Sequence, residues 1–180
     1  MASNTWGTWE IDPSHSTAEF RIRHLMISTV RGRFSDFSGQ IVGDPADLTT
    51  AKATLTIDVA SVDTRQPDRD NDLRSANFFD VANYPQMTFE STQIKKIGEN
   101  TYEVTGPLTI HGVTHEVPVK VEFLGFSKDP WGGERAGFTA STKINRKDFG
   151  LTWNAALETG GVLVGEEVTI EVELETVKKA

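Results

Sequence analysis

The chain has 180 residues, a length that suits one all-β domain, and its lack of cysteine excludes disulfides, thiolate metal sites and cysteine nucleophiles. The formal net charge of −8 argues against a nucleic-acid-binding protein, because such proteins carry a basic patch or stripe. Residues 1–12 lack the basic and apolar regions of a signal peptide, and no segment approaches the roughly 20 apolar residues of a membrane span. We therefore expect a cytoplasmic protein, unless a signal segment has been removed from it.

Apolar and polar residues alternate with period two along most of the chain, which predicts antiparallel strands with one solvated face. Phe34 and Phe37 fall on opposite parities, so a bulge is expected between them. His111-Gly112 and the segment 129–133 are typical turn sequences. In chain order, strands are predicted over residues 17–24, about 30–42, 51–59, 86–96, 101–110, 113–123, 136–144 and 162–174.

About eight such strands predict one antiparallel barrel over residues 1–180. Asp68 or Asp70 is expected to cap a short helix that runs through Leu73 and Ala76, and residues 145–149 are expected to form a turn. A ten-residue strand is about 33 Å long, so a barrel of tilted strands stands about 25 Å tall. Its interior is either filled by side chains or able to hold one ligand, and a tall, narrow, apolar space suits a long, thin molecule.

Five groups of residues, spread in order over nearly the whole chain, resemble the signature of the YceI-like family. The central group is the most distinctive, although many members carry histidine where this chain has Asp72, so no role of that histidine is carried over. The matching residues are Trp9, Ile11, Asp12, His15 and Ser16; His24 with Gly32-Arg33-Phe34; Arg69-Asp70, Leu73-Arg74-Ser75, Phe78-Phe79-Asp80, Tyr84-Pro85 and Phe89; Gly106 with residues 108–114; and Arg146-Lys147-Asp148-Phe149-Gly150.

The resemblance implies an elongated, eight-stranded, lipocalin-like barrel with one or two short helices. It also implies that the lumen holds a long isoprenoid lipid, a polyprenyl phosphate or an isoprenoid quinone, for storage or transport. No catalytic residue, metal or cofactor other than the bound lipid is expected, nucleic acid is not expected as a partner, and a homodimer is plausible by family analogy.

Strand parity predicts which side chains face the lumen and contact the ligand. His24 shares a face with apolar residues and is a candidate to hydrogen-bond a lipid head group, although a histidine satisfied by neighbouring backbone is the preferred interpretation. The predicted ligand-binding residues are Phe20, Ile22, His24, Phe34, Leu55, Ile57, Phe89, Leu108, Ile110, Val119, Val121, Phe138 and Ile144.

Two other readings of the barrel remain open. A filled core would make it a stress-response or interaction module that acts through its outer surface, and an enzyme acting on an amphiphile is the less favoured alternative. His111 and His115 flank a turn without accompanying acids, so turn formation is preferred over a metal site. Asp70 lies between arginines and is interpreted as a helix cap. Arginines at 21, 23, 31 and 33 favour an anionic head group near the first strands, whereas glutamates line the last strand.

Overall fold

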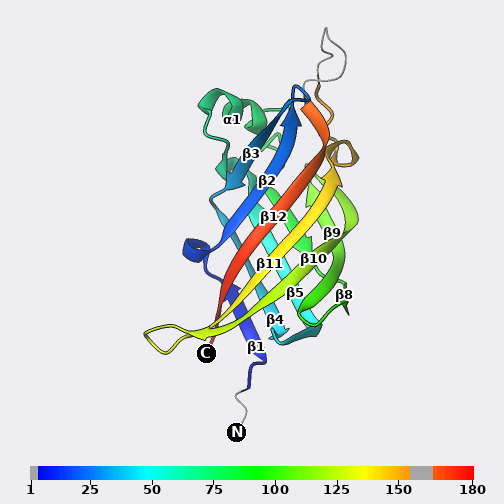
Figure 1. The fold of residues 1–180 in the computed structure, drawn as a ribbon. Helices are drawn as coiled ribbons and strands as arrows, with labels where there is room; N and C mark the ends of the chain where they lie inside the picture. The colour runs from blue at the N-terminus through cyan, green and yellow to red at the C-terminus, as the bar shows by residue number, and fades with distance from the viewer. Residues whose placement is uncertain (1–3, 155–163) are drawn as a thin grey trace.

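The protein is a closed antiparallel barrel of eight long strands, some of them interrupted, with one α-helix near one end (Figure 1). The computed structural model describes residues 4–154 and 164–180. The elements in chain order are β1 Gly7–Ile11, β2 Thr17–His24, β3 Ser28–Phe34, β4 Phe37–Asp44, β5 Asp47–Asp58, β6 Val62–Asp63, α1 Pro67–Arg74, β7 Gln86–Glu90, β8 Gln93–Lys96, β9 Thr101–Ile110, β10 Val113–Lys128, β11 Glu134–Asn145 and β12 Val164–Lys178. Short 3₁₀ turns span Pro13–His15, Val59–Ser61 and Arg146–Phe149.

The last strand closes the barrel by pairing with two different segments of the N-terminal region. The first part of β12 runs antiparallel to β2, for example with Ile170 opposite Phe20. The final residues of β12 pair with β1, with Thr176 opposite Ile11. Because β1 also pairs with β4, and β4 with β5, the hydrogen-bonded wall continues around the barrel.

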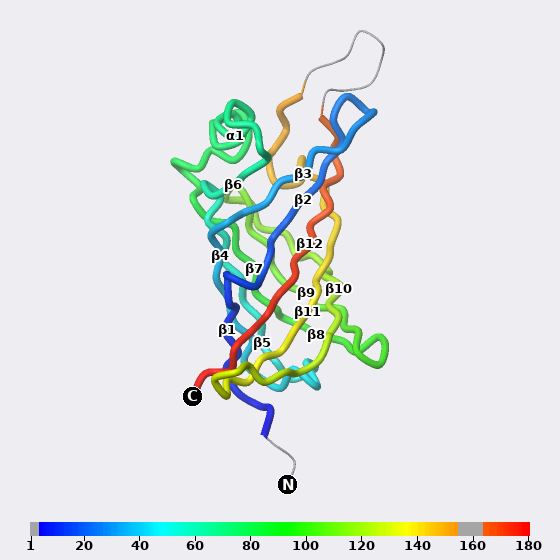
Figure 2. The backbone as a smooth tube through the Cα atoms, turned by 60° about the vertical axis from the view of Figure 1, so that its left-hand side comes forward, coloured from blue at the N-terminus to red at the C-terminus, as the bar shows by residue number. Residues whose placement is uncertain are grey.

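Strand pairing in the barrel wall is short beside β3, at the end of the barrel that carries α1. There β3 pairs on one side with β2 and on the other with only the two residues of β6. Figure 2 shows α1 lying beside this part of the barrel. Leu73 of α1 and Phe79, which follows the helix, pack against the buried core. The helical segment therefore completes the wall where strand pairing is short. None of the helices in the described parts of the chain is long and apolar enough to cross a bilayer.

The opposite end of the barrel, where β1 begins and β12 ends, is filled by large side chains. Trp9, Tyr102 and Phe138 are almost fully buried and belong to one apolar cluster with Ile41 and Leu48. The Trp9 indole also donates a hydrogen bond to the Thr5 carbonyl (3.1 Å). This packing fills the end away from α1 with apolar side chains.

The predicted strands are confirmed, but details of their interruptions are not. Val162, predicted in the last strand, lies outside the described residues. The short strands β1 and β6 were not predicted, because few residues alternate in them. The bulge expected between Phe34 and Phe37 is a break at Ser35 and Asp36, which lets both phenylalanines be buried on the inner face.

The expected helix cap was wrong. Gln66, not an aspartate, caps α1: its side-chain oxygen accepts a hydrogen bond from the Asp68 N–H (2.9 Å), and the helix ends at Arg74. Asp70 is buried and accepts hydrogen bonds from the Thr64 N–H (2.9 Å) and hydroxyl (2.5 Å). A cap is defined by where the backbone enters the helix, and Pro67 at the first turn moves that entry upstream.

Candidate functional site

The barrel lumen holds two adjoining cavities that extend one behind the other. The cavity nearer α1, called the upper cavity, has a volume of about 420 Å³, and the lower cavity has a volume of about 130 Å³. Ile57, Met87 and Ile170 line both of them. These shared side chains lie at the junction between the cavities, so the two apolar spaces are neighbours along the length of the barrel.

The apolar character of both cavities follows from strand alternation. Alternate residues of each strand point inward, and in this chain those positions are mostly leucine, isoleucine, valine and phenylalanine. The Phe20 ring lies directly over Gly32 of the neighbouring strand, where a Cβ atom would come within 2.3 Å of the ring. Phe20 in turn packs on Phe34, with ring centroids 5.4 Å apart. Gly32 thus makes room for an aromatic wall of the upper cavity.

Every residue predicted to bind ligand lies on the wall of one of these cavities. The ligand contacts themselves stay a prediction. Phe20, Ile22, His24, Phe34, Ile110 and Ile144 line the upper cavity; Leu55, Phe89, Leu108, Val119, Val121 and Phe138 line the lower one; Ile57 lines both.

Several lining residues were missed by parity alone. Ile170 lies in the strand predicted over residues 162–174 and Met87 in the one predicted over 86–96, but neither residue was assigned to the lumen. Leu73, Phe79 and Trp153 line the upper cavity from segments outside the main strands, where period-two alternation gives no signal. The conspicuous Phe78-Phe79 pair was the available hint for that part of the wall.

Polar groups gather on the wall of the upper cavity near its α1 end. Arg146 is buried, and its guanidinium donates to the carbonyls of Leu151 (2.5 Å), Gly165 (2.7 Å) and Val164 (3.4 Å). Burial lowers the pKa of Arg146 below its ordinary value, and the Glu166 carboxylate partly opposes that shift. A cationic group is therefore held at the cavity wall by backbone carbonyls, and no carboxylate of the described residues forms an ion pair with it.

His24 lies at the same end of the upper cavity and is partly buried. Its imidazole makes no hydrogen bond with any residue in the described ranges, whereas its backbone carbonyl accepts from the Ser28 hydroxyl (3.3 Å). The interpretation of a histidine ring satisfied by neighbouring backbone is thus not what the structure shows. The ring remains available to a polar ligand atom.

The N-terminal arginines lie close together in the sequence, but in the structure they do not form one free cationic patch. Arg21 forms an ion pair with Glu171 of the adjacent β12 (2.7 Å), and Arg33 lies 3.7 Å from Asp63. The pairing of β2 with β12 places the basic and acidic strands side by side, which sequence separation concealed. Only Arg23 of this group borders the upper cavity.

The other polar candidates have structural partners. His111 adopts a positive φ of 55° beside Gly112 at the β9–β10 turn, and the His115 imidazole contacts the Asp148 carbonyl (2.8 Å). Among the described residues no group of three or more possible ligands is placed to hold a metal.

Asp12, Ser14 and His15 form a surface cluster, but its geometry differs from that of a catalytic triad. Both the Asp12 carboxylate (2.9 Å) and the Ser14 hydroxyl (3.1 Å) contact the same ring nitrogen, Nδ1 of His15. A triad needs the acid and the nucleophile on opposite nitrogens of the imidazole. Arg135 also donates to Asp12, at the same Oδ2 atom that His15 contacts (2.9 Å), so the cluster ties β11 to the segment between β1 and β2.

A closed antiparallel barrel with an elongated apolar lumen defines the lipocalin-like class of proteins. Residues 9–176 match the family model described as the YceI-like domain, and the chain belongs to this family. UPF0312 protein SERP2314 of Staphylococcus epidermidis is 47% identical over 168 residues, covering 93% of this chain and 95% of that protein. A UPF0312 protein of Ectopseudomonas mendocina is 44% identical over 138 residues, covering 77% and 72%.

Solved structures share the architecture. BcnA of Burkholderia cenocepacia superposes with a TM-score of 0.81 at 30% identity, covering 92% of this chain and 98% of BcnA. The YCEI protein of Campylobacter jejuni gives 0.74 at 34% identity, with both chains covered completely. A polyisoprenoid binding domain from Saccharophagus degradans gives 0.72 at 19% identity, covering 95% and 98%, which shows a common fold.

Proposed function

We propose that this protein binds a long-chain isoprenoid lipid, a polyprenyl phosphate or an isoprenoid quinone, and stores or transports it without chemical change. The observation that supports this most directly is the pair of neighbouring apolar cavities in the lumen, which share the lining residues Ile57, Met87 and Ile170. The Saccharophagus domain with the same fold is named a polyisoprenoid binding domain, which is the same class of ligand. Open volume in the lumen counts against a barrel whose core is filled.

The cavity volumes set the length of chain that the lumen can enclose. A cavity of 150 Å³ accommodates benzene, which corresponds to roughly 25 Å³ per carbon. On that scale the upper cavity of about 420 Å³ holds roughly 17 carbons and the lower cavity of about 130 Å³ roughly five more. This is close to about four isoprene units, so a longer polyprenyl tail would extend beyond the lumen.

The head group is proposed to lie at the α1 end, beside His24 and Arg146. Trp9, Tyr102 and Phe138 fill the lower end, so the polar end of a bound lipid is expected at the wider, α1 end. The free His24 ring offers a donor or acceptor to a quinone carbonyl or a phosphate. Burial of the tail supplies about 0.8 kcal/mol per methylene before ordering terms, and the head group sets its direction.

Native mass spectrometry of the purified protein, followed by organic extraction, tests the proposal. We expect a stoichiometric isoprenoid on the wild-type protein and on Glu171→Gln, whose side chain lies outside the barrel. Val168→Trp, which places a large ring in the upper cavity, should lose the ligand while keeping its far-UV spectrum. A wild-type protein that stays empty after incubation with prenyl quinones and prenyl phosphates would contradict lipid carriage, and turnover of the bound lipid over hours would show an enzyme instead.

A further inference from the structure

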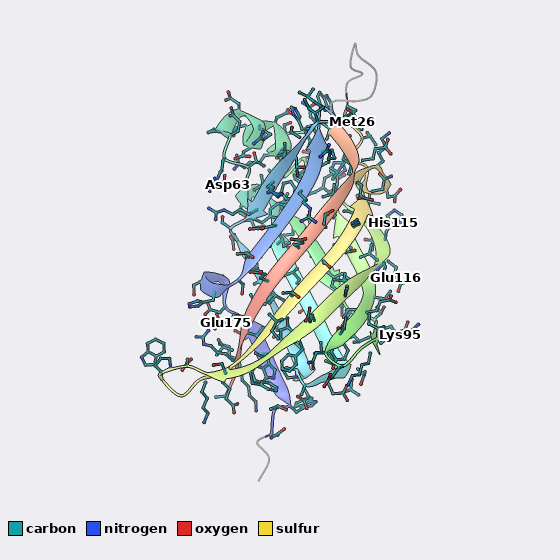
Figure 3. The ribbon with its side chains drawn as sticks, viewed as in Figure 1. Met26, Asp63, Lys95, His115, Glu116 and Glu175 are labelled. Carbon is teal, nitrogen blue, oxygen red and sulfur yellow. The ribbon has the colours of Figure 1, made fainter. Side chains whose placement is uncertain are left out.

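The turn between β2 and β3 presents three apolar side chains to solvent at the α1 end of the barrel. Leu25 is 37% exposed, Met26 51% and Ile27 80%, and together they are called the apolar tip. Figure 3 labels Met26 at that extremity of the molecule. Isolated exposed apolar residues are common on protein surfaces, but three in succession on a projecting turn indicate an interaction site.

The backbone of the apolar tip is poorly matched to its residues. Leu25 and Met26 have φ angles of 55° and 61°, and the Ile27 N–H donates to the His24 carbonyl (3.2 Å). Two successive positive φ angles in a tight hairpin turn favour Asn-Gly or similar residues. Strained backbone of this kind gathers at functional positions. Folding therefore does not explain why bulky apolar residues occupy the turn.

Two arginines lie on the strands that lead to the apolar tip, Arg23 beside the turn and Arg31 further along β3, opposite Arg21. Arg23 on β2 and Arg31 on β3 are exposed, and no carboxylate in the described ranges lies within 4.0 Å of either guanidinium. Arg23 Nη2 donates to the Met26 carbonyl (3.1 Å), which steadies the turn. Apolar residues followed by free cations match an anionic bilayer, because the former enter the acyl region and the latter reach the phosphates.

The apolar tip adjoins the proposed lipid site. His24, the residue before Leu25, lines the upper cavity, and so does the exposed Trp153, which packs on Phe78 with ring centroids 5.4 Å apart. Tryptophan is favoured at membrane interfaces because one part of the ring is apolar and the N–H is polar.

We propose that the apolar tip docks on an anionic phospholipid bilayer and brings the upper cavity to the membrane surface. The passage of an isoprenoid between bilayer and lumen rests on the function proposed above, whereas docking itself does not.

Acidic groups at this end limit the strength of docking. Asp68 and Asp72 border the upper cavity from the α1 side, while Glu166 is ion-paired with Lys147 (2.7 Å). With a net charge of −8 on the whole chain, attraction to an anionic bilayer depends on local cations, such as those on the β2–β3 side. Docking is therefore expected to be reversible, to need anionic lipid, and to weaken as salt is added.

The test is co-sedimentation with phosphatidylcholine vesicles that contain or lack phosphatidylserine. Leu25→Asn/Met26→Gly/Ile27→Thr removes the apolar tip while giving the turn its preferred residues, so this variant should fold at least as stably as the wild type. Arg23→Gln/Arg31→Gln removes the two cations. Ile97→Ser is the matched control, because Ile97 is 57% exposed at the β8–β9 turn near the opposite end.

We expect the wild type and Ile97→Ser to bind vesicles with phosphatidylserine, and both other variants to lose about tenfold or more in affinity. Wild-type protein that fails to bind, or a tip variant that binds equally well, would overturn the proposal. So would a tip variant that only converts a dimer to a monomer, since a second copy would then cover the tip. Mass spectrometry of the same samples separates the two proposals: wild-type protein that docks through the tip but carries no isoprenoid supports docking and contradicts lipid carriage.

Discussion

Replacing Ile170 with tryptophan is expected to divide the lumen at its junction and remove the lower cavity from ligand binding. Ile170 is only partly buried and lines both cavities, so the larger ring projects into open space instead of into packed core. The lower cavity of about 130 Å³ corresponds to roughly five carbons of a prenyl chain. At about 0.8 kcal/mol per carbon, losing it weakens long-chain binding by at most about 4 kcal/mol, or about a thousandfold in Kd.

The assay is titration of the protein with farnesol and with the longer geranylfarnesol, followed by intrinsic tryptophan fluorescence or calorimetry. Wild-type protein should bind geranylfarnesol much more tightly, because only the longer chain reaches past Ile57 and Met87. Ile170→Trp should bind both alcohols with similar affinity, because neither chain then enters the lower cavity. Glu171→Gln, the next residue on β12 but on the outer face, serves as the control, since an exposed ion pair contributes under about 1 kcal/mol. If Ile170→Trp keeps the wild-type preference for the longer chain, the lower cavity takes no part in binding.

Two further substitutions test the hydrogen bonds of Arg146 and of Asp12. Arg146→Met leaves the carbonyls of Leu151, Gly165 and Val164 without their donor, so the free energy of unfolding measured in urea should fall by about 3 kcal/mol. The control Lys143→Gln, at an exposed position, should lower it by under about 0.5 kcal/mol. Equal stability of the two variants would contradict a structural role for Arg146. Hydrogen bonds from Ser14 and His15, and then Arg135, hold the pKa of Asp12 far below its ordinary 3.8, so its stabilisation is present above about pH 4 and is lost as the pH falls through the depressed value. Asp12→Asn should lower stability at neutral pH and approach the wild type in strong acid, and a difference that stays constant from neutral pH into strong acid would refute this linkage.

Strand positions and the inward face were predictable because each depends on neighbouring residues. The alternation in 101–110 places Leu108 and Ile110 on one face, and the lumen is built from that face. The turn at His111-Gly112 was likewise readable, since the residues themselves tolerate positive φ. The site residues on the main strands follow from the same local rule.

The remaining site residues depend on which distant segments pack together. Patterns among neighbouring residues do not predict such contacts. Arg146 was visible as part of a motif, but its role follows from the approach of Gly165 and Val164. Trp153 and Phe79 reach the cavity from loops whose course is set by packing.

The sequence by itself determined that the chain forms an antiparallel barrel with an apolar interior, because side-chain direction in a strand has a fixed period of two. Only the tertiary structure decided that β12 pairs with both β1 and β2, and that the lumen is wider towards His24 and filled by packed side chains near Trp9. It also decided that Arg21 is ion-paired with Glu171, whereas Arg23 and Arg31 have no carboxylate partner among the described residues. These features arise from contacts between residues far apart in the chain, so they depend on the register and closure of the whole sheet.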